Sequence, residues 1–181
     1  MKTRALGSLV LLLGLVATGQ ATAQAQGGGL REVHRHQGFW FSIGAGGGWA
    51  DTDFRLGNTG RGGAGYFRMG GTVSPRVLFG GEVLAWFTRV NGRDISRANI
   101  TAAALLYPSL RGGWFIKPGF GFATYDIDGF ERSGIATTVG TGFDFRLTRN
   151  FYVTPNVDYQ VQFFADDTVG SLLISLGATW H

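Results

Sequence analysis

The chain has 181 residues and no cysteine, and its 16 basic and 12 acidic residues give a net charge of +4. This length suits a single domain, and the absence of cysteine excludes disulfides, thiolate metal sites and cysteine nucleophiles. Two of the bases, Lys2 and Arg4, precede an apolar run near the start, and the rest of the chain has a net charge of only +2. Because no cluster of Lys and Arg follows, we expect no nucleic acid partner.

The composition favours a folded sheet over a disordered chain. The sequence has 31 Gly, 4 Pro, 15 Phe, 5 Trp and 5 Tyr, and only 15% of its residues are charged. Disordered chains are poor in aromatic residues and rich in charge or proline. Few charges combined with many glycines and aromatics are typical of a sheet with one side facing lipid.

Residues 1–26 have the three parts of a secretory signal peptide. Two bases start the chain, an apolar run (LVLLLGLVA) fills 9–17, and two Ala-x-Ala cleavage sites lie within 21–25. A membrane-spanning helix needs about 20 apolar residues, so this run is too short for a permanent anchor. We therefore expect a cleaved signal peptide (1–26), a flexible periplasmic lead-in (27–37) and a folded region (38–181).

The folded region contains eight stretches in which apolar residues alternate with small or polar residues. Period-two alternation predicts strands with two unlike faces. In chain order, the predicted strands are 39–49, 62–73, 77–88, 95–106, 113–124, 134–147, 151–163 and 169–180. Each is long enough to cross a bilayer at the usual tilt.

The connections between these strands are alternately short and long. The short turns lie around Pro75, Ser109 and Arg149, and the longer loops lie around Asn58, Asn91, Asp128 and Asp166. Short turns belong on the periplasmic side of a membrane barrel and longer loops outside, so both termini should be periplasmic. Charge agrees with this orientation, because each short turn carries one Arg and no acid, whereas the loops hold eight acidic and five basic residues.

The last strand shows the alternation most clearly (VGSLLISLGATW). Leu172, Ile174, Leu176, Ala178 and Trp180 share one face, and Ser171, Ser175, Gly177 and Thr179 share the other. Behind a signal peptide, eight such strands predict an exported chain that closes into a small barrel in an outer membrane. Aromatic residues near both strand ends support two interfacial belts: Phe39, Phe41, Trp114, Phe151 and Trp180 on the periplasmic side, and Trp49, Phe87 and Phe163 on the outer side.

The alternative fold is a soluble up-and-down barrel such as a lipocalin, whose apolar faces would surround a ligand. The two folds differ in which face of the sheet points outward: the membrane barrel requires Phe79, Val139 and Ile174 outside and Glu82 and Asp144 inside.

Two prolines, Pro118 and Pro155, lie within predicted strands. Since proline removes a ladder hydrogen bond, we expect bulges or weakened pairing at both.

The alternating C-terminal sequence LLISLGATWH, with Trp180 before the final His181, resembles the small eight-stranded outer-membrane β-barrel family. The resemblance covers the whole region after the signal peptide. It implies an all-β, eight-stranded, antiparallel up-and-down transmembrane β-barrel in the cell outer membrane. It further implies a monomer that contacts outer-membrane lipid and lipopolysaccharide and is inserted by the barrel insertion machinery through its C-terminal strand.

Seven charged residues fall on the inward face of the predicted strands: Arg68, Glu82, Arg97, Lys117, Asp144, Arg146 and Asp158. The lumen of an eight-stranded barrel is just wide enough for side chains to fill it, and buried charges must pair. The favoured interpretation is therefore a structural ion-pair network. A narrow gated pore, opened by exchange of salt-bridge partners, is the alternative. Many glycines share this face and make room for long side chains: Gly44, Gly46, Gly48, Gly70, Gly80, Gly119, Gly121, Gly140 and Gly142.

No residue pattern indicates catalysis, a metal site or a cofactor. His34 and His36 lie in the lead-in, and no histidine lies on a strand beside a serine, as nucleophilic catalysis would need. The acidic group Asp126, Asp128 and Glu131 lacks the spacing of a calcium loop. Divalent ions that bridge it to lipopolysaccharide phosphates stay open as an alternative.

We therefore expect a non-enzymatic integral outer-membrane protein with a structural or interaction role. A small porin-like channel is the second hypothesis. A lipid-modifying enzyme is the third, because related barrels include lipid A deacylases and palmitoyl transferases.

Overall fold

A computed structural model describes residues 37–51, 59–90, 92–127 and 130–181. The predicted signal peptide, nearly all of the lead-in with His34 and His36, and Asp128 lie outside these residues. The strands are β1 (Phe39–Asp51), β2 (Thr59–Ser74), β3 (Val77–Val90), β4 (Arg93–Leu106), β5 (Trp114–Ile127), β6 (Phe130–Phe143), β7 (Phe145–Arg146), β8 (Phe151–Phe163) and β9 (Thr168–Trp180). The described residues include no helix long and apolar enough to cross a membrane.

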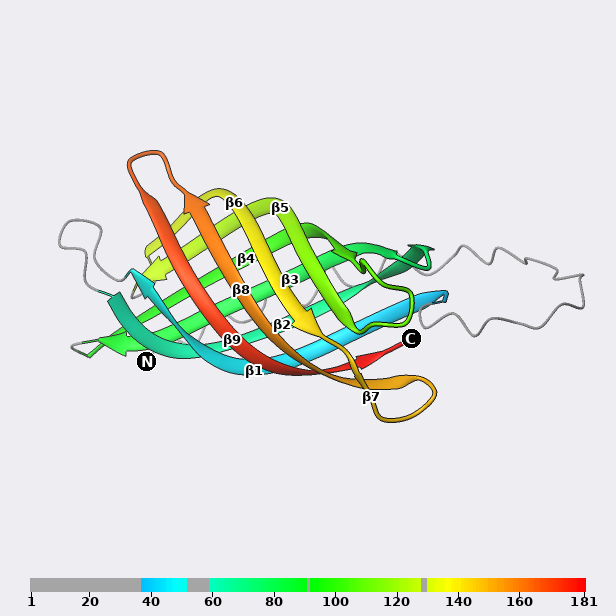
Figure 1. Cartoon of the computed structure of the whole chain (residues 1–181). Coiled ribbons are helices and arrows are strands. Elements are labelled where there is room, and N and C mark those ends of the chain that lie inside the picture. Colours follow the sequence, from blue (N-terminus) through cyan, green and yellow to red (C-terminus); the bar gives the residue numbers. More distant parts are fainter. Residues whose placement is uncertain (1–36, 52–58, 91, 128–129) are drawn as a thin grey trace, which may run out of the picture. The chain divides into compact units, whose positions relative to one another are not determined.

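The strands form one closed antiparallel sheet (Figure 1). Strands that are neighbours in sequence pair with each other, except that β6 and β7 both pair with β8. The strand β1 also pairs with β9, from Phe41–Trp180 to Ala50–Ser171. Closure leaves no free edge, which is the condition for placing a sheet in hydrocarbon. The predicted all-β, up-and-down barrel is confirmed.

Two prolines interrupt the ladder, each on one side only. Pro118 stays paired with Val139 of β6, but pairing between β4 and β5 stops at Gly119 and resumes at Ile116. Proline has no N–H to donate, so β5 loses pairs toward β4 while its register is unchanged. The pairing is weakened as predicted, without a bulge.

Pro155 has the same effect between β6 and β8. It stays paired with Leu176 of β9, whereas the β6–β8 pairs stop at Asn156 and pairing continues between β7 and β8 from Val153. Elements β6 and β7 are thus one strand with a break at Asp144, as the predicted strand 134–147 implies. Counted in this way, the barrel has eight strands.

Apolar side chains cover the outer wall and polar side chains fill the interior. Phe79, Val139 and Ile174 are 53%, 59% and 48% exposed, whereas Glu82 and Asp144 are each 1% exposed. An apolar wall facing water would carry a large free-energy penalty, whereas facing lipid it is favourable. The arrangement is that of a membrane barrel and excludes the lipocalin-like alternative.

The outer ends of the first six strands extend two to four residues beyond the predicted ones. Alternation stops where lipid stops, but hairpin pairing continues into water, which explains the difference. The connection between β3 and β4 is a tight hairpin, because β3 ends at Val90 and β4 begins at Arg93, and the dipeptide Asn91-Gly92 in the sequence predicts a hairpin at this place. Gly92 has a φ of 81°, as a two-residue hairpin turn requires.

The last residues of β9 and His181 pack within the aromatic belt that the sequence analysis expects on the periplasmic side. Trp180 lies between Phe41, with ring centroids 4.8 Å apart, and Phe151, at 4.9 Å. The His181 ring is edge-on to that of Tyr152, with ring centroids 5.0 Å apart, and the backbone N–H of His181 donates to the Asn150 carbonyl. Burial lowers the pKa of His181 to about 4, so this terminal ring is neutral at pH 7.

Substitution of Ile100 by arginine tests whether the apolar outer wall faces lipid. Ile100 is 54% exposed and lies near the middle of β4 on that wall. We expect Ile100→Arg to lower the free energy of unfolding in lipid vesicles by about 2–4 kcal/mol, measured by urea titration. Ser96 is exposed on the same face near the outer end of β4, and Ser96→Arg should have little effect. Equal effects at the two positions would contradict a lipid-facing wall.

Candidate functional site

Four charged side chains meet in the middle of the lumen, and we call them the ion quartet: Arg68, Glu82, Lys117 and Asp158. They come from β2, β3, β5 and β8, and all are about 1% exposed or less. Arg68 and Glu82 are directly opposite each other on neighbouring strands. The backbone register therefore places one ion pair without any long reach.

Lys117 and Asp158 meet across an intervening strand. Both pair in register with Gly140 of β6, Lys117 from one side and Asp158 from the other. A Cβ on Gly140 would lie 3.1 Å from the Lys117 Cε and 3.1 Å from the Asp158 Cγ. Glycine at this position is what lets the two long side chains meet.

Each cation of the ion quartet contacts both carboxylates. Arg68 pairs with Glu82 through Nε and with Asp158 through Nη2, the latter at 2.9 Å. Lys117 Nζ contacts Glu82 and lies 2.8 Å from Asp158 Oδ1. The ion quartet is therefore neutral as a whole, which is how buried charges are tolerated.

A second layer lies toward the outer side. Asn99 donates to Gln160 at 2.6 Å and accepts from Gln162 at 2.5 Å. Arg97 lies between two aromatic rings, with its guanidinium 5.4 Å from the centroid of Trp86 and 4.9 Å from that of Tyr125. Such cation–π contacts stabilise a desolvated guanidinium.

A third layer surrounds Asp144 toward the opposite end of the barrel, where the short turns lie. Its carboxylate accepts hydrogen bonds from the Tyr107 and Thr154 hydroxyls, each at 2.6 Å. Tyr107 lies just beyond β4, and burial, together with the Asp144 carboxylate, raises the pKa of its hydroxyl well above the ordinary value. Tyr107 therefore remains a hydrogen-bond donor at any physiological pH.

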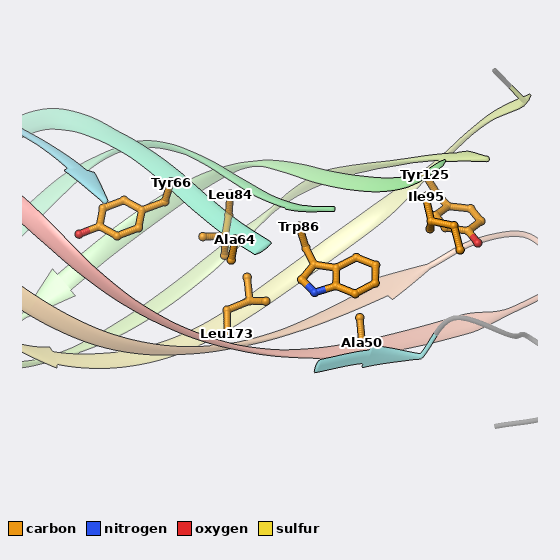
Figure 2. Packing of buried hydrophobic residues seen from close by; sticks show 8 residues of the cluster. All are labelled: Ala50, Ala64, Tyr66, Leu84, Trp86, Ile95, Tyr125 and Leu173. Carbon is orange, nitrogen blue, oxygen red and sulfur yellow. The ribbon is translucent and has the colours of Figure 1, made fainter. Parts of the chain in front are cut away.

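Two clusters of buried apolar residues flank the ion quartet, one toward each end of the lumen, and they contact the second and third polar layers. Figure 2 shows the larger one, which contains Tyr66, Leu84, Trp86, Ile95, Tyr125 and Leu173 with two alanines. The smaller cluster consists of Trp40, Leu78, Leu105, Tyr107 and Phe115. Most of these residues were not singled out as functional from the sequence. Their positions on the same alternating face as the charges were the available signal.

Arg146 differs from its prediction. The other six predicted lumen charges are buried, but Arg146 is exposed and donates to the carbonyls of Thr148 and Arg149, each at 3.1 Å. It is the last residue of β7, beyond the break at Asp144, and its side chain bonds the turn that follows β7 in water. Alternation in sequence could not show that the strand ends there.

In the described part of the chain, no three acidic residues come together in a group that could hold a metal ion. Asp126 and Glu131 are opposite each other on β5 and β6, and Asp128 lies outside the described residues. A shallow pocket of about 370 Å³ lies nearby at the outer ends of β3 to β5, lined by Phe87, Thr88, Arg89, Asp94, Ile95, Ser96 and Asp126. In this pocket Arg89 and Asp94 form an exposed bidentate salt bridge, with Nε–Oδ1 and Nη2–Oδ2 distances of 2.6 and 2.7 Å.

The contribution of the ion quartet can be measured by removing one cation. We expect Lys117→Met to lower the free energy of unfolding by about 3–5 kcal/mol, because it leaves two buried carboxylates to share Arg68 and one negative charge uncompensated. The double variant K117M/E82Q keeps one cation and one anion and should recover part of this loss. Urea titration in vesicles is the measurement.

The matched control is the exposed pair, whose side chains are 70% and 68% exposed. Arg89→Gln should leave the unfolding midpoint unchanged, since exposed pairs contribute little. If K117M were no more damaging than R89Q, the ion quartet would have no role in stability.

Comparison with known proteins places the fold. No family model and no curated protein sequence matches the chain. The structure is similar to the crystal structure of Neisserial surface protein A, with 18% identity, a TM-score of 0.65, and coverage of 80% of this chain and 97% of that one. It is also similar to two Pseudomonas aeruginosa proteins: the outer membrane protein OprG (13% identity, TM-score 0.51, coverage 83% and 100%) and the N-terminal β-barrel domain of OprF (15% identity, TM-score 0.51, coverage 80% and 98%). The chain therefore has the fold of the small eight-stranded outer-membrane β-barrels.

Proposed function

We propose that the protein is a closed, non-enzymatic outer-membrane barrel with a structural or interaction role. The observation that carries this proposal is the filled lumen. The neutral ion quartet occupies the centre, hydrogen-bonded amides lie above it, and apolar clusters lie toward both ends. A barrel filled in this way serves as an anchor, and its outer hairpins are the parts that meet the surroundings.

The porin-like alternative is less well supported. An open channel needs a continuous water-filled path, but Trp86 and Tyr125 toward one end and Trp40 and Phe115 toward the other are at most 2% exposed. Inside the lumen, each cation of the ion quartet already contacts two carboxylates. Opening a pore would require breaking several charged contacts at once.

The enzymatic alternative lacks a supporting constellation in the described residues. The histidine among them, His181, packs against Tyr152 at the periplasmic belt. Asp144 is bonded by two hydroxyls that belong to buried layers rather than to an open cleft. This arrangement supports a structural role for the carboxylate.

The proposal includes the route to the membrane and the surroundings expected from the sequence. The chain is exported with cleavage of 1–26, is inserted by the barrel insertion machinery through β9, and acts as a monomer. Outer-membrane lipid and lipopolysaccharide are its immediate partners. The apolar wall and the Trp180 belt support this placement.

Conductance in planar bilayers tests the closed barrel. We expect the refolded protein to insert without producing steady channels, since the lumen has no free path. Compact migration on an unheated gel, lost on boiling, is the control for correct folding. Steady channels that disappear in Glu82→Gln would overturn the proposal and favour the gated pore.

A further inference from the structure

The barrel has one junction, among the strands that the structure describes, that joins segments far apart in sequence. This is the seam between β1 and β9, where Ser42 and Thr179 are in register. All the other paired strands are close in sequence, so the loss of chain entropy when they pair is small. Pairing at the seam joins the two ends of the sheet and therefore costs more chain entropy. Contacts across the seam therefore decide whether the barrel stays closed.

A chain of side-chain hydrogen bonds crosses this seam on the lumen side. Thr154 of β8 is bonded to Thr179 of β9 at 3.0 Å, and Thr179 is bonded to Ser42 of β1 at 2.7 Å. Ser42 is bonded to the hydroxyl of Tyr66 of β2 at 3.2 Å, and this hydroxyl accepts from Asn156 of β8 at 2.9 Å. All five residues are buried.

The direction of every bond follows from the groups at the two ends. A hydroxyl has one proton to donate, and Thr154 donates its proton to the Asp144 carboxylate. Thr179 must then donate to Thr154, Ser42 must donate to Thr179, and each hydroxyl accepts from the next. The whole chain of donors thus points toward one carboxylate.

The other end requires the same direction. Arg68 Nη1 donates to the Asn156 side-chain oxygen at 3.1 Å, and arginine cannot accept. The Asn156 nitrogen therefore faces Tyr66 and donates to it, which leaves the Tyr66 proton for Ser42. A cation at the donor end and an anion at the acceptor end polarise the bonds between them in one direction, and bonds aligned in this way strengthen one another.

The Tyr66 ring itself lies over the seam. Gly44 of β1 and Gly177 of β9 are paired opposite each other. A Cβ on Gly44 or Gly177 would lie 2.6 or 2.8 Å from the Tyr66 Cζ. Both strands therefore lack a side chain where this ring, which starts on β2, reaches across them toward β8.

We infer that these residues form a closure chain that holds the barrel shut at its seam: Asn156, Tyr66, Ser42, Thr179, Thr154 and Asp144. The closure chain begins on β8, passes through β2, β1 and β9, and returns to β8 beside Asp144. It bridges the seam with directed side-chain bonds in addition to the backbone ladder. Its specific consequence is that β1 and β9 separate more easily when one hydroxyl is removed.

Amide hydrogen exchange of the full chain, refolded into detergent micelles, tests the closure chain. We expect Thr179→Val to accelerate exchange in peptides from β1 and β9 by about tenfold, with smaller changes in β3 to β5. Thr179→Ser keeps the hydroxyl and should keep the protection. Tyr66→Phe, which removes one hydroxyl and keeps the ring, should act like T179V.

The matched control is Thr138 of β6, a lumen residue that is 1% exposed and has no hydrogen bond from its hydroxyl. Thr138→Val makes the same chemical change outside the closure chain and should leave β1 and β9 protected. The inference is overturned if T179V changes seam exchange no more than T138V, or if it accelerates all strands equally. If T179V does not reach the compact folded band while T179S and T138V do, the hydroxyl is required for closure and the inference is supported.

Discussion

Backbone N–H and C=O groups cannot be left unpaired in hydrocarbon, and this constraint governs the whole molecule. It demands that β1 and β9 pair, which closes the sheet. Closure with eight strands leaves an interior only wide enough for side chains. The charges, amides and hydroxyls on the inward face must therefore satisfy one another. The ion quartet and the closure chain are consequences of that small, closed interior.

Glycine decides how the interior is filled. Eight strands cannot all contribute long side chains to one narrow lumen, so long residues reach over positions that have none. Lys117 and Asp158 meet across Gly140, and Tyr66 lies across Gly44 and Gly177. The abundance of glycine thus has a packing reason on the inward face as well as allowing the sheet to curve.

The ladder is weakest where the two prolines lie. Pro118 removes pairs between β4 and β5, and Pro155 removes pairs between β6 and β8. Both gaps adjoin the buried polar layers, so side-chain bonds remain where backbone bonds are missing: Lys117 is bonded within the ion quartet, and Asp144 accepts from Thr154 beside the second gap. The seam, by contrast, has both an unbroken ladder and the closure chain.

Period-two alternation determined the strands and grouped Glu82, Lys117 and Asp158 on one face, because side-chain direction in a strand depends only on parity. The expectation that this face is the inner one came from the signal peptide, the glycine content, the aromatic strand ends and the last strand. Parity wrongly predicted that Arg146 is a buried lumen residue, since the alternating pattern continues beyond the end of the lumen. The partners inside the barrel depend on register and on which strands face each other across the lumen, and no local pattern encodes either. Only the tertiary structure, therefore, could join Lys117 to Asp158 across Gly140 and direct the Ser42–Thr179 hydroxyls toward Asp144, because those contacts exist only once the sheet has closed.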